Sequence, residues 1–303
     1  MLIHKLTTYH GKPQKYLYSL LTIPRIKRRI KLIFLYFRYL TNWIRVYPDF
    51  IIIGAGKCGT TSLYYYLKQH PNIKTSYNKE VQFFNKKNYY LGSKWYRSFF
   101  PSLFFKYFYK YILKRKLITG ESTADYIRHP IVAKRIYSLL PNVKIIILLR
   151  NPVDRAYSDY NMNVKWNLEK LSFEEAIEKE NEILKGGIDR ILIDKHYKHY
   201  KFNQFFYLLR GIYINQIKFW FRYFPKEQIL ILKSEDFNNN PPSILKEVFK
   251  FLELPNWRLF QYKKWRKRNY QKMDDKTRTW LINFYKPYNK RLYEFLGINF
   301  NWD

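Results

Sequence analysis

Three glycines and a lysine crowd into one short stretch of the chain. Gly54, Gly56 and Gly59 fall within six positions although the whole sequence holds only 10 glycines, and Lys57 stands between the last two. Glycines let the backbone turn so that successive N–H groups point at one spot, and a lysine adds a full positive charge. Three hydroxyl side chains follow at once, those of Thr60, Thr61 and Ser62. The pattern predicts a cradle for a phosphate group, because a plain strand-to-helix turn needs neither the lysine nor the hydroxyls.

This arrangement differs from the loop of nucleoside triphosphatases. In that loop a lysine and then Ser or Thr directly follow the last glycine, whereas Lys57 comes two residues before Gly59. A later apolar run, residues 143–149, ends in Arg150 and not in an aspartate that could hold magnesium. Arginine binds phosphate directly, and Ser158, about two helical turns further on, could grip the same phosphate from another side. The sequence therefore predicts a metal-free site for an anionic nucleotide.

Short buried strands and helices must bring these residues together. The strands are predicted at 50–53, 117–119, 143–149 and 228–232, where apolar and β-branched residues form short runs. The helices are predicted at 60–69, 130–140, from 152 onward, and at 173–184, 212–224 and 241–254. We expect Thr60 or Thr61 to cap the first helix and Asn151 the third. This alternation indicates an α/β fold with a central parallel sheet flanked by helices, in which Arg150 lies at the carboxyl edge where such sheets bind ligands.

The chain divides at residue 50. No linker or repeat interrupts residues 50–303, so we expect a single domain there, with substrate loops in the irregular stretches 186–210 and 255–275. Residues 1–49 form a basic helical segment in which a cluster of cations precedes an apolar run at 32–37. Either this helix packs on the domain with a solvated basic face, which we favour, or it makes peripheral contact with an anionic membrane.

Composition limits the classes of protein. The 303 residues carry 56 Lys and Arg against 23 Asp and Glu, a net charge of +33, which suits an anionic partner or reflects an AT-rich coding sequence. One cysteine excludes a disulfide framework and a cysteine-rich zinc site. His196 and His199 could share a helix face, but no further ligand stands nearby, so no metal is predicted. Apolar runs fall short of the roughly 20 residues of a spanning helix, and no signal peptide is evident, so we expect a cytoplasmic location.

The motifs resemble those of sulfotransferases that use 3′-phosphoadenosine 5′-phosphosulfate (PAPS). The stretch 57–62 resembles their P-loop-like 5′-phosphosulfate-binding loop, and 149–160 resembles their 3′-phosphate motif. Three further stretches, 79–85, 120–126 and 210–213, and the tail 287–297 resemble the branch that sulfates glycosaminoglycans, which includes heparan sulfate N- and 3-O-sulfotransferases. The resemblance covers nearly all of 50–303. It implies PAPS as co-substrate, adenosine 3′,5′-bisphosphate as product, and no metal.

The resemblance also implies a role for each matching residue. Lys57 would face the oxygen that bridges sulfate and phosphate, and Glu80 would act as general base on an acceptor hydroxyl or amine, while Asp274 and Glu121 are weaker alternatives for the base. Lys79 and Gln82 would orient the acceptor. The residues that would hold the nucleotide are Lys57, Cys58, Gly59, Thr60, Thr61 and Ser62 at the 5′-phosphate and Arg150 and Ser158 at the 3′-phosphate.

The sequence departs from that branch in its last nucleotide-binding loop. The disulfide-closed hairpin of the animal N-sulfotransferases is missing, and the usual Lys-Gly-Arg run is replaced by residues 266–270, from which Lys267, Arg268 and Tyr270 would contact the nucleotide. Nothing in these 303 residues resembles the N-deacetylase domain of that branch. The acceptor stays open between a glycan and a small lipid or metabolite. The basic surface would suit an acidic glycan polymer. A basic nucleic-acid-binding protein with a non-catalytic nucleotide loop is the alternative from another class, and no specific nucleic-acid partner is expected.

Overall fold

A five-stranded parallel sheet organises the molecule. The computed structural model describes residues 25–185, 206–263 and 270–302. In these ranges the strand order is β2-β3-β1-β4-β5. The strands are β1 (Phe50–Gly54), β2 (Ile73–Thr75), β3 (Ile118–Ser122), β4 (Lys144–Leu149) and β5 (Ile229–Lys233). Phe50 at the start of β1 lies level with Gly120 on one side and Lys144 on the other. The predicted α/β fold with a central parallel sheet is confirmed.

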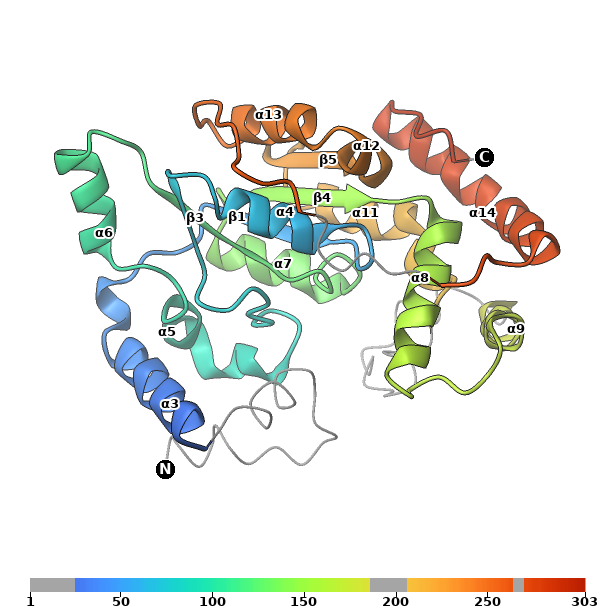
Figure 1. The fold of residues 1–303 in the computed structure, drawn as a ribbon, viewed down its shortest axis with the longest axis horizontal. Helices are drawn as coiled ribbons and strands as arrows, with labels where there is room; N and C mark the ends of the chain where they lie inside the picture. Colours follow the sequence, from blue (N-terminus) through green and yellow to red (C-terminus); the bar gives the residue numbers. More distant parts are fainter. Residues whose placement is uncertain (1–24, 186–205, 264–269, 303) are drawn as a thin grey trace.

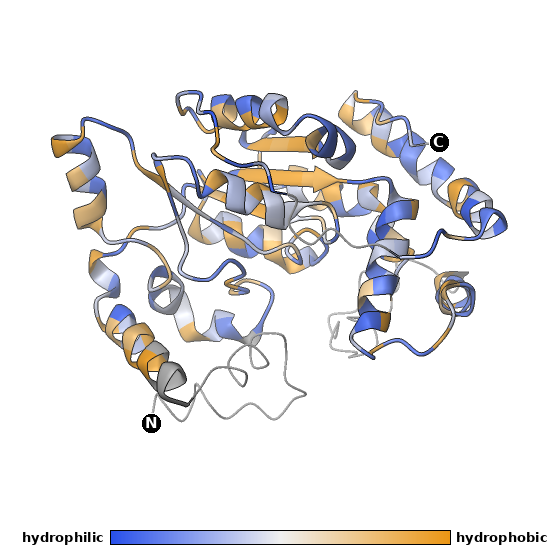
Figure 2. Ribbon diagram, in the orientation of Figure 1, coloured by the Kyte–Doolittle hydropathy of each residue, from blue (hydrophilic) through white to orange (hydrophobic). Residues whose placement is uncertain are grey.

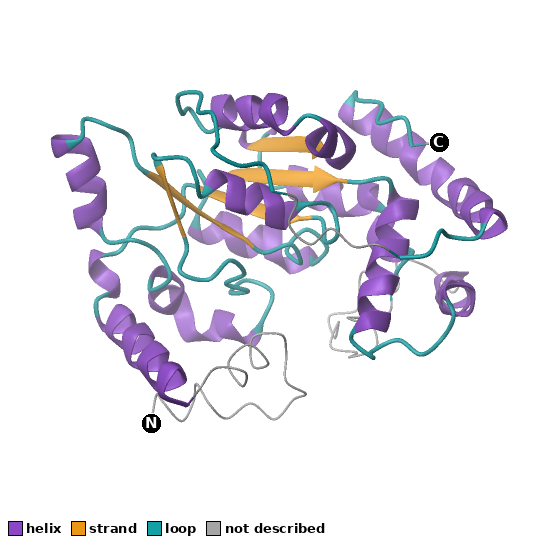
Figure 3. Ribbon diagram, in the orientation of Figure 1, coloured by secondary structure: helices purple, strands orange, loops and turns teal. Residues whose placement is uncertain are grey.

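Helices cover both faces of this sheet (Figures 1 and 3). On one face lie α4 (Thr60–Leu67) and α13 (Pro241–Phe251), which His70 and Phe249 bridge with ring centroids 4.7 Å apart. On the other face lie α7 (Pro130–Leu139) and α11 (Tyr213–Phe221). The remaining α-helices are α3 (Arg25–Leu40), α5 (Gly92–Arg97), α6 (Leu103–Tyr107), α8 (Pro152–Lys165), α9 (Phe173–Lys185), α12 (Ser234–Asn239) and α14 (Asp275–Leu296). Single turns complete the set: η1 (Asn42–Ile44), η2 (Lys87–Leu91), η3 (Phe108–Ile112), η5 (Leu209–Gly211) and η6 (Lys226–Gln228).

The strand order creates one crevice at the carboxyl edge of the sheet. The chain leaves β1 toward β2 on one side and leaves β4 toward β5 on the other side. Loops that diverge in this way open a gap between the two strand ends, and open α/β sheets bind ligands there. The loop after Gly54 and the residue after Leu149 both reach this gap.

The predicted cap of α8 is confirmed, and the predicted cap of α4 is not. Asn151 caps α8, because its side-chain oxygen accepts a hydrogen bond of 2.9 Å from the N–H of Val153. The prediction that Thr60 or Thr61 caps α4 is wrong. The cap is Gly59, whose φ of 91° turns the chain sharply and which offers no side chain to the exposed N–H groups. The first turn of α4 is thus left open to an external anion.

The basic segment before residue 50 packs on the domain through its last turns. Arg38 of α3 donates hydrogen bonds of 2.7 Å to the carbonyls of Ser98 and Phe100, and Phe34 lies against Tyr77. The outer face of α3 is not simply basic, however, since Ile33 and Phe37 are exposed there. Among the described residues, no helix is both long and apolar enough to cross a membrane. The boundary at residue 50 stays a proposal, because the buried core runs without a break from Val46 to Trp302.

Candidate active site

The glycine-rich loop is held at its start and open at its tip. The N–H of Ala55 donates a 2.7 Å hydrogen bond to the carbonyl of Leu148, which ties the loop to β4. Lys57 and Gly59 both adopt the left-handed conformation, with φ of 73° and 91°. A Cβ placed on Gly56 would meet no atom within 4 Å, so the space above it is clear. Backbone N–H groups, an uncapped helix start and a clear space fit a phosphate group.

Cys58 belongs to the support of this loop. Its side chain is fully buried, and its Sγ lies 3.8 Å from the hydroxyl of Tyr213. Burial raises the pKa of the Cys58 thiol to about 11, against a smaller opposite effect of the Arg155 charge. Its N–H donates to the carbonyl of Ala55 at 3.3 Å. The side chain of Cys58 therefore points into the core beneath the loop, and away from the place where it was predicted to contact the nucleotide.

Arg150 meets the loop from β4. Its Nη1 donates to the carbonyl oxygen of Lys57 at 3.4 Å, and its own carbonyl accepts a 2.9 Å hydrogen bond from the Tyr213 hydroxyl. Tyr213 thus touches both the loop, through Cys58, and the backbone of Arg150. Two segments that lie 93 residues apart in the sequence are held side by side.

Helix α8 forms the wall beside Lys57. The amine of Lys57 lies 3.6 Å from the Sδ of Met162. Ser158 precedes Met162 by one helical turn, and residues four apart share one face of a helix. Ser158 is nearly buried on that face. The structure thus places Lys57 next to Arg150 and next to the face of α8 that carries Ser158.

A buried charge network supports α8 from below. Asp159 accepts hydrogen bonds from Arg155 at 3.2 Å and from Arg210 at 2.7 Å. Burial alone would raise the pKa of Asp159, but Arg210 and Arg155, with a smaller effect of Lys57, hold it below its usual value. Arg155 also donates to the carbonyl of Tyr207. A buried ion pair of this kind fixes geometry more than it adds stability.

The predicted general base stands on a loop fixed to the end of β3. Glu80 contacts Lys79 at 3.1 Å and accepts from the Gln82 amide at 3.3 Å. The carbonyl of Lys79 accepts from the N–H of Ser122 at 3.1 Å. The three predicted acceptor-side residues therefore lie together, beside the strand that neighbours β1.

More basic residues surround this loop. Burial lowers the pKa of Lys86, which also feels the charges of Asp125, Arg128 and Glu80. The pKa of Asp125 lies well below its usual range, because Arg128 and Arg210 outweigh the effect of burial. Arg210 pairs with Asp159 and also lowers the pKa of Asp125, so it lies between α8 and the loop that carries Asp125.

Glu121 is fully buried beneath the Glu80 loop. A base must reach the acceptor, so the predicted alternative role of Glu121 as base does not fit this position. Its carboxylate accepts 2.7 Å hydrogen bonds from the hydroxyls of Tyr96 and Thr123. Thr123 Oγ1 in turn accepts from the N–H of Gln82 at 3.4 Å. Glu121 thereby holds the Glu80 loop from underneath. Burial raises its pKa to about 7, although the Tyr96 and Thr123 hydrogen bonds act in the opposite direction.

A Glu121→Gln substitution is expected to change stability in a pH-dependent way. The folded-state pKa of about 7 lies above the value of 4.5 for a free glutamate, so ionisation of Glu121 costs the folded state stability as the pH rises from 4.5 to about 7. Glutamine does not ionise, and the stability of the variant relative to the parent should therefore improve by about 3 kcal/mol from acid to neutral pH. Urea unfolding of both proteins at pH 4 and pH 8 measures this difference. Glu178→Gln, at an exposed position of α9, is the control, and a pH-independent gap would contradict the assignment.

The last predicted nucleotide loop is only partly described. Lys267 and Arg268 lie outside the described residues. Tyr270 packs edge-on against Tyr157 of α8, with ring centroids 5.4 Å apart, so the described end of this loop lies against α8. The alternative base Asp274 caps α14 by accepting from the N–H of Thr277 at 3.0 Å, which gives it a structural role.

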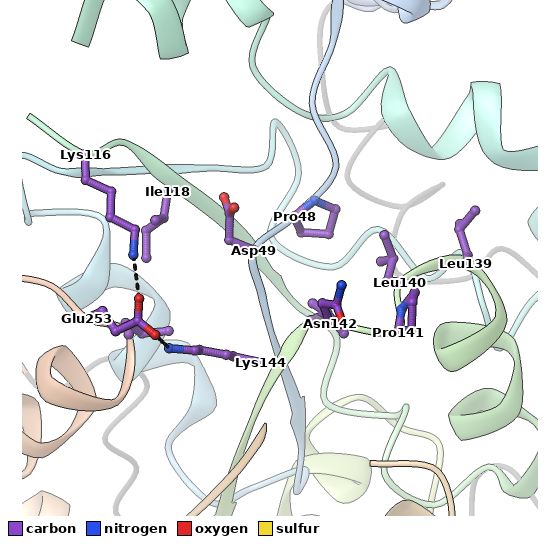
Figure 4. Close-up of a pocket in the computed structure, with 12 residues that line it drawn as sticks. Pro48, Asp49, Lys116, Ile118, Leu139, Leu140, Pro141, Asn142, Lys144 and Glu253 are labelled. Carbon is purple, nitrogen blue, oxygen red and sulfur yellow. Dashed lines mark hydrogen bonds and ion pairs between the residues drawn. The ribbon is translucent and has the colours of Figure 1, made fainter. Parts of the chain in front are cut away.

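No metal centre is found in the described ranges, where no three His, Cys, Asp or Glu side chains come close enough to hold an ion. His196 and His199 lie outside these ranges. A pocket of about 380 Å³ opens at the amino edge of the sheet, opposite the phosphate loop. There Lys116 and Lys144 both bind Glu253, at 2.8 and 2.6 Å (Figure 4). This ion-pair cluster joins β4 to the end of α13 and is separate from the crevice.

Sequence reasoning missed the residues that support the site. Tyr213, Glu121 and Met162 each hold a predicted site residue in place. The first two fall within the motifs 210–213 and 120–126; the resemblance gave no role to Tyr213 and offered Glu121 only as an alternative base. Nothing in the sequence marks Met162.

Comparisons with known proteins agree with this geometry. A family model described as the sulfotransferase domain matches residues 47–286. The membrane-associated sulfotransferase kil1 of Dictyostelium discoideum is 30% identical, over 84% of this chain and 66% of that protein. The bifunctional heparan sulfate N-deacetylase/N-sulfotransferase 1 of Caenorhabditis elegans is 30% identical, over 83% of this chain and 30% of that protein.

The comparison of folds agrees as well. The crystal structure of a sulfotransferase from Alicyclobacillus acidocaldarius superposes with a TM-score of 0.66 at 28% identity, and covers 85% of this chain and 99% of the other. In contrast, the chain spans less than two thirds of the length of the curated relatives named above. With the match of residues 47–286, these findings show that the chain belongs to the sulfotransferase domain family, whose members use PAPS as the sulfuryl donor.

Proposed function

We propose that this chain transfers the sulfuryl group of PAPS to a hydroxyl or amine of a glycan by in-line displacement. One observation carries the proposal: Nη1 of Arg150 lies 3.4 Å from the carbonyl oxygen of Lys57, so the two predicted phosphate-binding segments lie side by side. A nucleotide with phosphates at its 3′ and 5′ positions fits two such segments. The bond from sulfur to the bridging oxygen breaks while the acceptor oxygen or nitrogen bonds to sulfur, and the acceptor loses a proton.

The proposed roles follow from position. The N–H groups of Gly59, Thr60 and Thr61 and the hydroxyl of Ser62 hold the 5′-phosphate, and Arg150 with Ser158 holds the 3′-phosphate. Lys57 neutralises the charge that develops on the leaving oxygen, which is the largest contribution expected of a preorganised site. Glu80 takes the proton of the acceptor, and Lys79 and Gln82 hold both the base and the sugar. Lys267 and Arg268 would add contacts to the nucleotide.

The surroundings of Glu80 support an acidic glycan as acceptor. Lys79 and Lys86 stand near that residue, while Arg128 and Arg210 pair with Asp125 and Asp159. A cationic cleft raises the local concentration of an anionic polymer. Several relatives are named for heparan sulfate, which fits this reading.

Transfer of labelled sulfate from PAPS to a panel of acceptors tests the proposal. We expect transfer to acidic polysaccharides, and a comparison of N-acetylated with free-amine forms distinguishes oxygen from nitrogen as the acceptor atom. Transfer only to small phenols, sterols or other metabolites would favour the small-acceptor alternative. Salt-dependent binding to DNA or RNA without any transfer would overturn the enzyme assignment.

An Arg150→Ala substitution is expected to remove discrimination for the 3′-phosphate. Charge-assisted hydrogen bonds to phosphate contribute about 1.5–3 kcal/mol, so the affinity for adenosine 3′,5′-bisphosphate should fall roughly 10- to 100-fold. The affinity for adenosine 5′-phosphate should change little. Calorimetry with both nucleotides measures the two effects, and Arg222→Ala, at the exposed residue that follows α11, serves as control. Equal losses for both nucleotides would place Arg150 elsewhere than at the 3′-phosphate.

A further inference from the structure

Two segments of the chain share an unusual composition. Residues 25–40 and residues 103–116 contain only Lys, Arg, Ile, Leu, Phe and Tyr. The first holds six cations and the second five, and neither holds an acidic, amide or hydroxymethyl side chain. They correspond to α3 and to α6 with η3 and the turn that follows.

The apolar side chains of both segments face water. Phe104 and Ile112 are 72% and 68% exposed, and Ile33 and Phe37 are 69% and 58% exposed. Further exposed members of the second segment are Leu103, Phe105, Tyr107, Phe108, Tyr111 and Leu113. Isolated apolar residues on a surface are ordinary, but a contiguous group of this size marks a contact surface.

The two segments are held together where the chain leaves the first and enters the second. An antiparallel bridge pairs Arg45, just after η1, with Ser102, just before α6, and the N–H of Val46 donates to the carbonyl of Pro101 at 3.0 Å. Trp43, which lies between the segments, is 71% exposed. Figure 1 shows α3 and α6 on the same side of the molecule, away from α8, α9 and α14, and Figure 2 shows hydrophobic residues along both helices. We call this surface, residues 30–43 and 103–115, the aromatic–cationic face.

Ion pairs fix the second segment at both ends. Lys106 binds Asp49 at 3.0 Å, and Lys116 binds Glu253 at 2.8 Å. Between these anchors Lys110, Lys114 and Arg115 are exposed among the aromatic rings. The segment is therefore held to the body of the protein while its cations and rings point outward.

We propose that the aromatic–cationic face docks on an anionic lipid bilayer as a peripheral membrane-binding surface. Aromatic rings and aliphatic side chains prefer the interface between headgroups and acyl chains, and Lys and Arg contact anionic headgroups through long apolar stems. A second copy of the chain is a poor occupant, because it would bring like charges together. A glycan or a nucleic acid is a poorer occupant, because both segments lack the acidic and amide side chains that commonly hydrogen-bond to sugars and bases. The proposal does not depend on sulfuryl transfer.

Co-sedimentation with vesicles tests the proposal on the full chain. We expect binding to vesicles of phosphatidylcholine with phosphatidylserine, much weaker binding to phosphatidylcholine alone, and a loss at high salt. The double variant Phe104→Ser, Ile112→Ser should bind at least roughly tenfold more weakly, because it removes two large apolar side chains from the contact. The matched control is Phe260→Ser, Ile183→Ser, which changes exposed residues of the same types outside the face.

A second variant separates charge from folding. Lys110→Glu, Arg115→Glu keeps every apolar side chain, and should weaken binding to the anionic vesicles roughly tenfold or more. The urea midpoint and the affinity for adenosine 3′,5′-bisphosphate should match the parent in both variants. Equal binding to neutral and anionic vesicles, or binding that neither variant changes, would overturn the proposal. The proposal would also fail if the parent bound no vesicles and the substitutions instead dissociated an oligomer or abolished binding of an acidic polysaccharide.

Discussion

A Lys57→Gln variant is expected to lose turnover on the order of 10²- to 10³-fold at saturating PAPS, with a much smaller loss of affinity for adenosine 3′,5′-bisphosphate. The left-handed backbone at Lys57 and the contact of its amine with Met162 hold the charge beside the phosphate loop. That charge matters most when negative charge builds up on the leaving oxygen. An interaction that strengthens in the transition state lowers kcat more than it lowers binding.

Steady-state transfer kinetics and calorimetry together measure this split. Lys68→Gln, at the exposed end of α4, is the matched control and should behave as the parent does. If Lys57→Gln weakens nucleotide binding as much as it lowers kcat, then Lys57 acts as an ordinary phosphate ligand and has no special part in the displacement.

Glu80→Gln is expected to lower kcat by roughly 10²- to 10⁴-fold, the usual contribution of a positioned general base. The amide has nearly the same shape as the carboxylate, so the loop that Glu121 and Thr123 support should keep its position. The affinity for adenosine 3′,5′-bisphosphate should be unchanged.

A conservative variant distinguishes a base from a structural carboxylate. Glu80→Asp should retain part of the activity that Glu80→Gln loses, because a shorter carboxylate can still take a proton. Glu227→Gln, exposed on η6, is the control. Full turnover by Glu80→Gln would show that another group removes the acceptor proton.

The sequence predicts the site well where its signals are local. The apolar run at 50–53, the glycines and the start of α4 are neighbours in the chain, so composition alone indicates strand, turn and helix. Arg150 follows directly from the most apolar strand. The contact between Arg150 and Lys57 depends on the pairing of β1 with β4, which is a tertiary event that the parallel-sheet prediction only implies.

Other elements carry weak or misleading local signals. β2 has three residues and one buried side chain, so its formation depends on its pairing with β3. The 22-residue helix α14 contains Pro287, which by itself argues against a continuous helix. The buried stripe that includes Leu281, Tyr285 and Leu292 holds the helix against the domain in spite of it.

Burial of polar groups is the hardest feature to anticipate. Carboxylates are rarely buried, so nothing local predicts that Glu121 has no contact with solvent. Its partner Tyr96 lies 25 residues earlier in the chain. The exposed side of α3 is the opposite case, because the sequence indicates an amphipathic helix but not which of its apolar residues stay outside the core.

The position of Cys58 makes its thiol a natural probe of motion in the nucleotide loop. Its sulfur is the sole thiol in the chain and is sealed beneath the turn against Tyr213. A reagent that alkylates thiols can reach it only when that turn lifts away from α11. The labelling rate of the native protein therefore reports how often the loop opens, and a bound nucleotide that holds the loop closed would lower that rate.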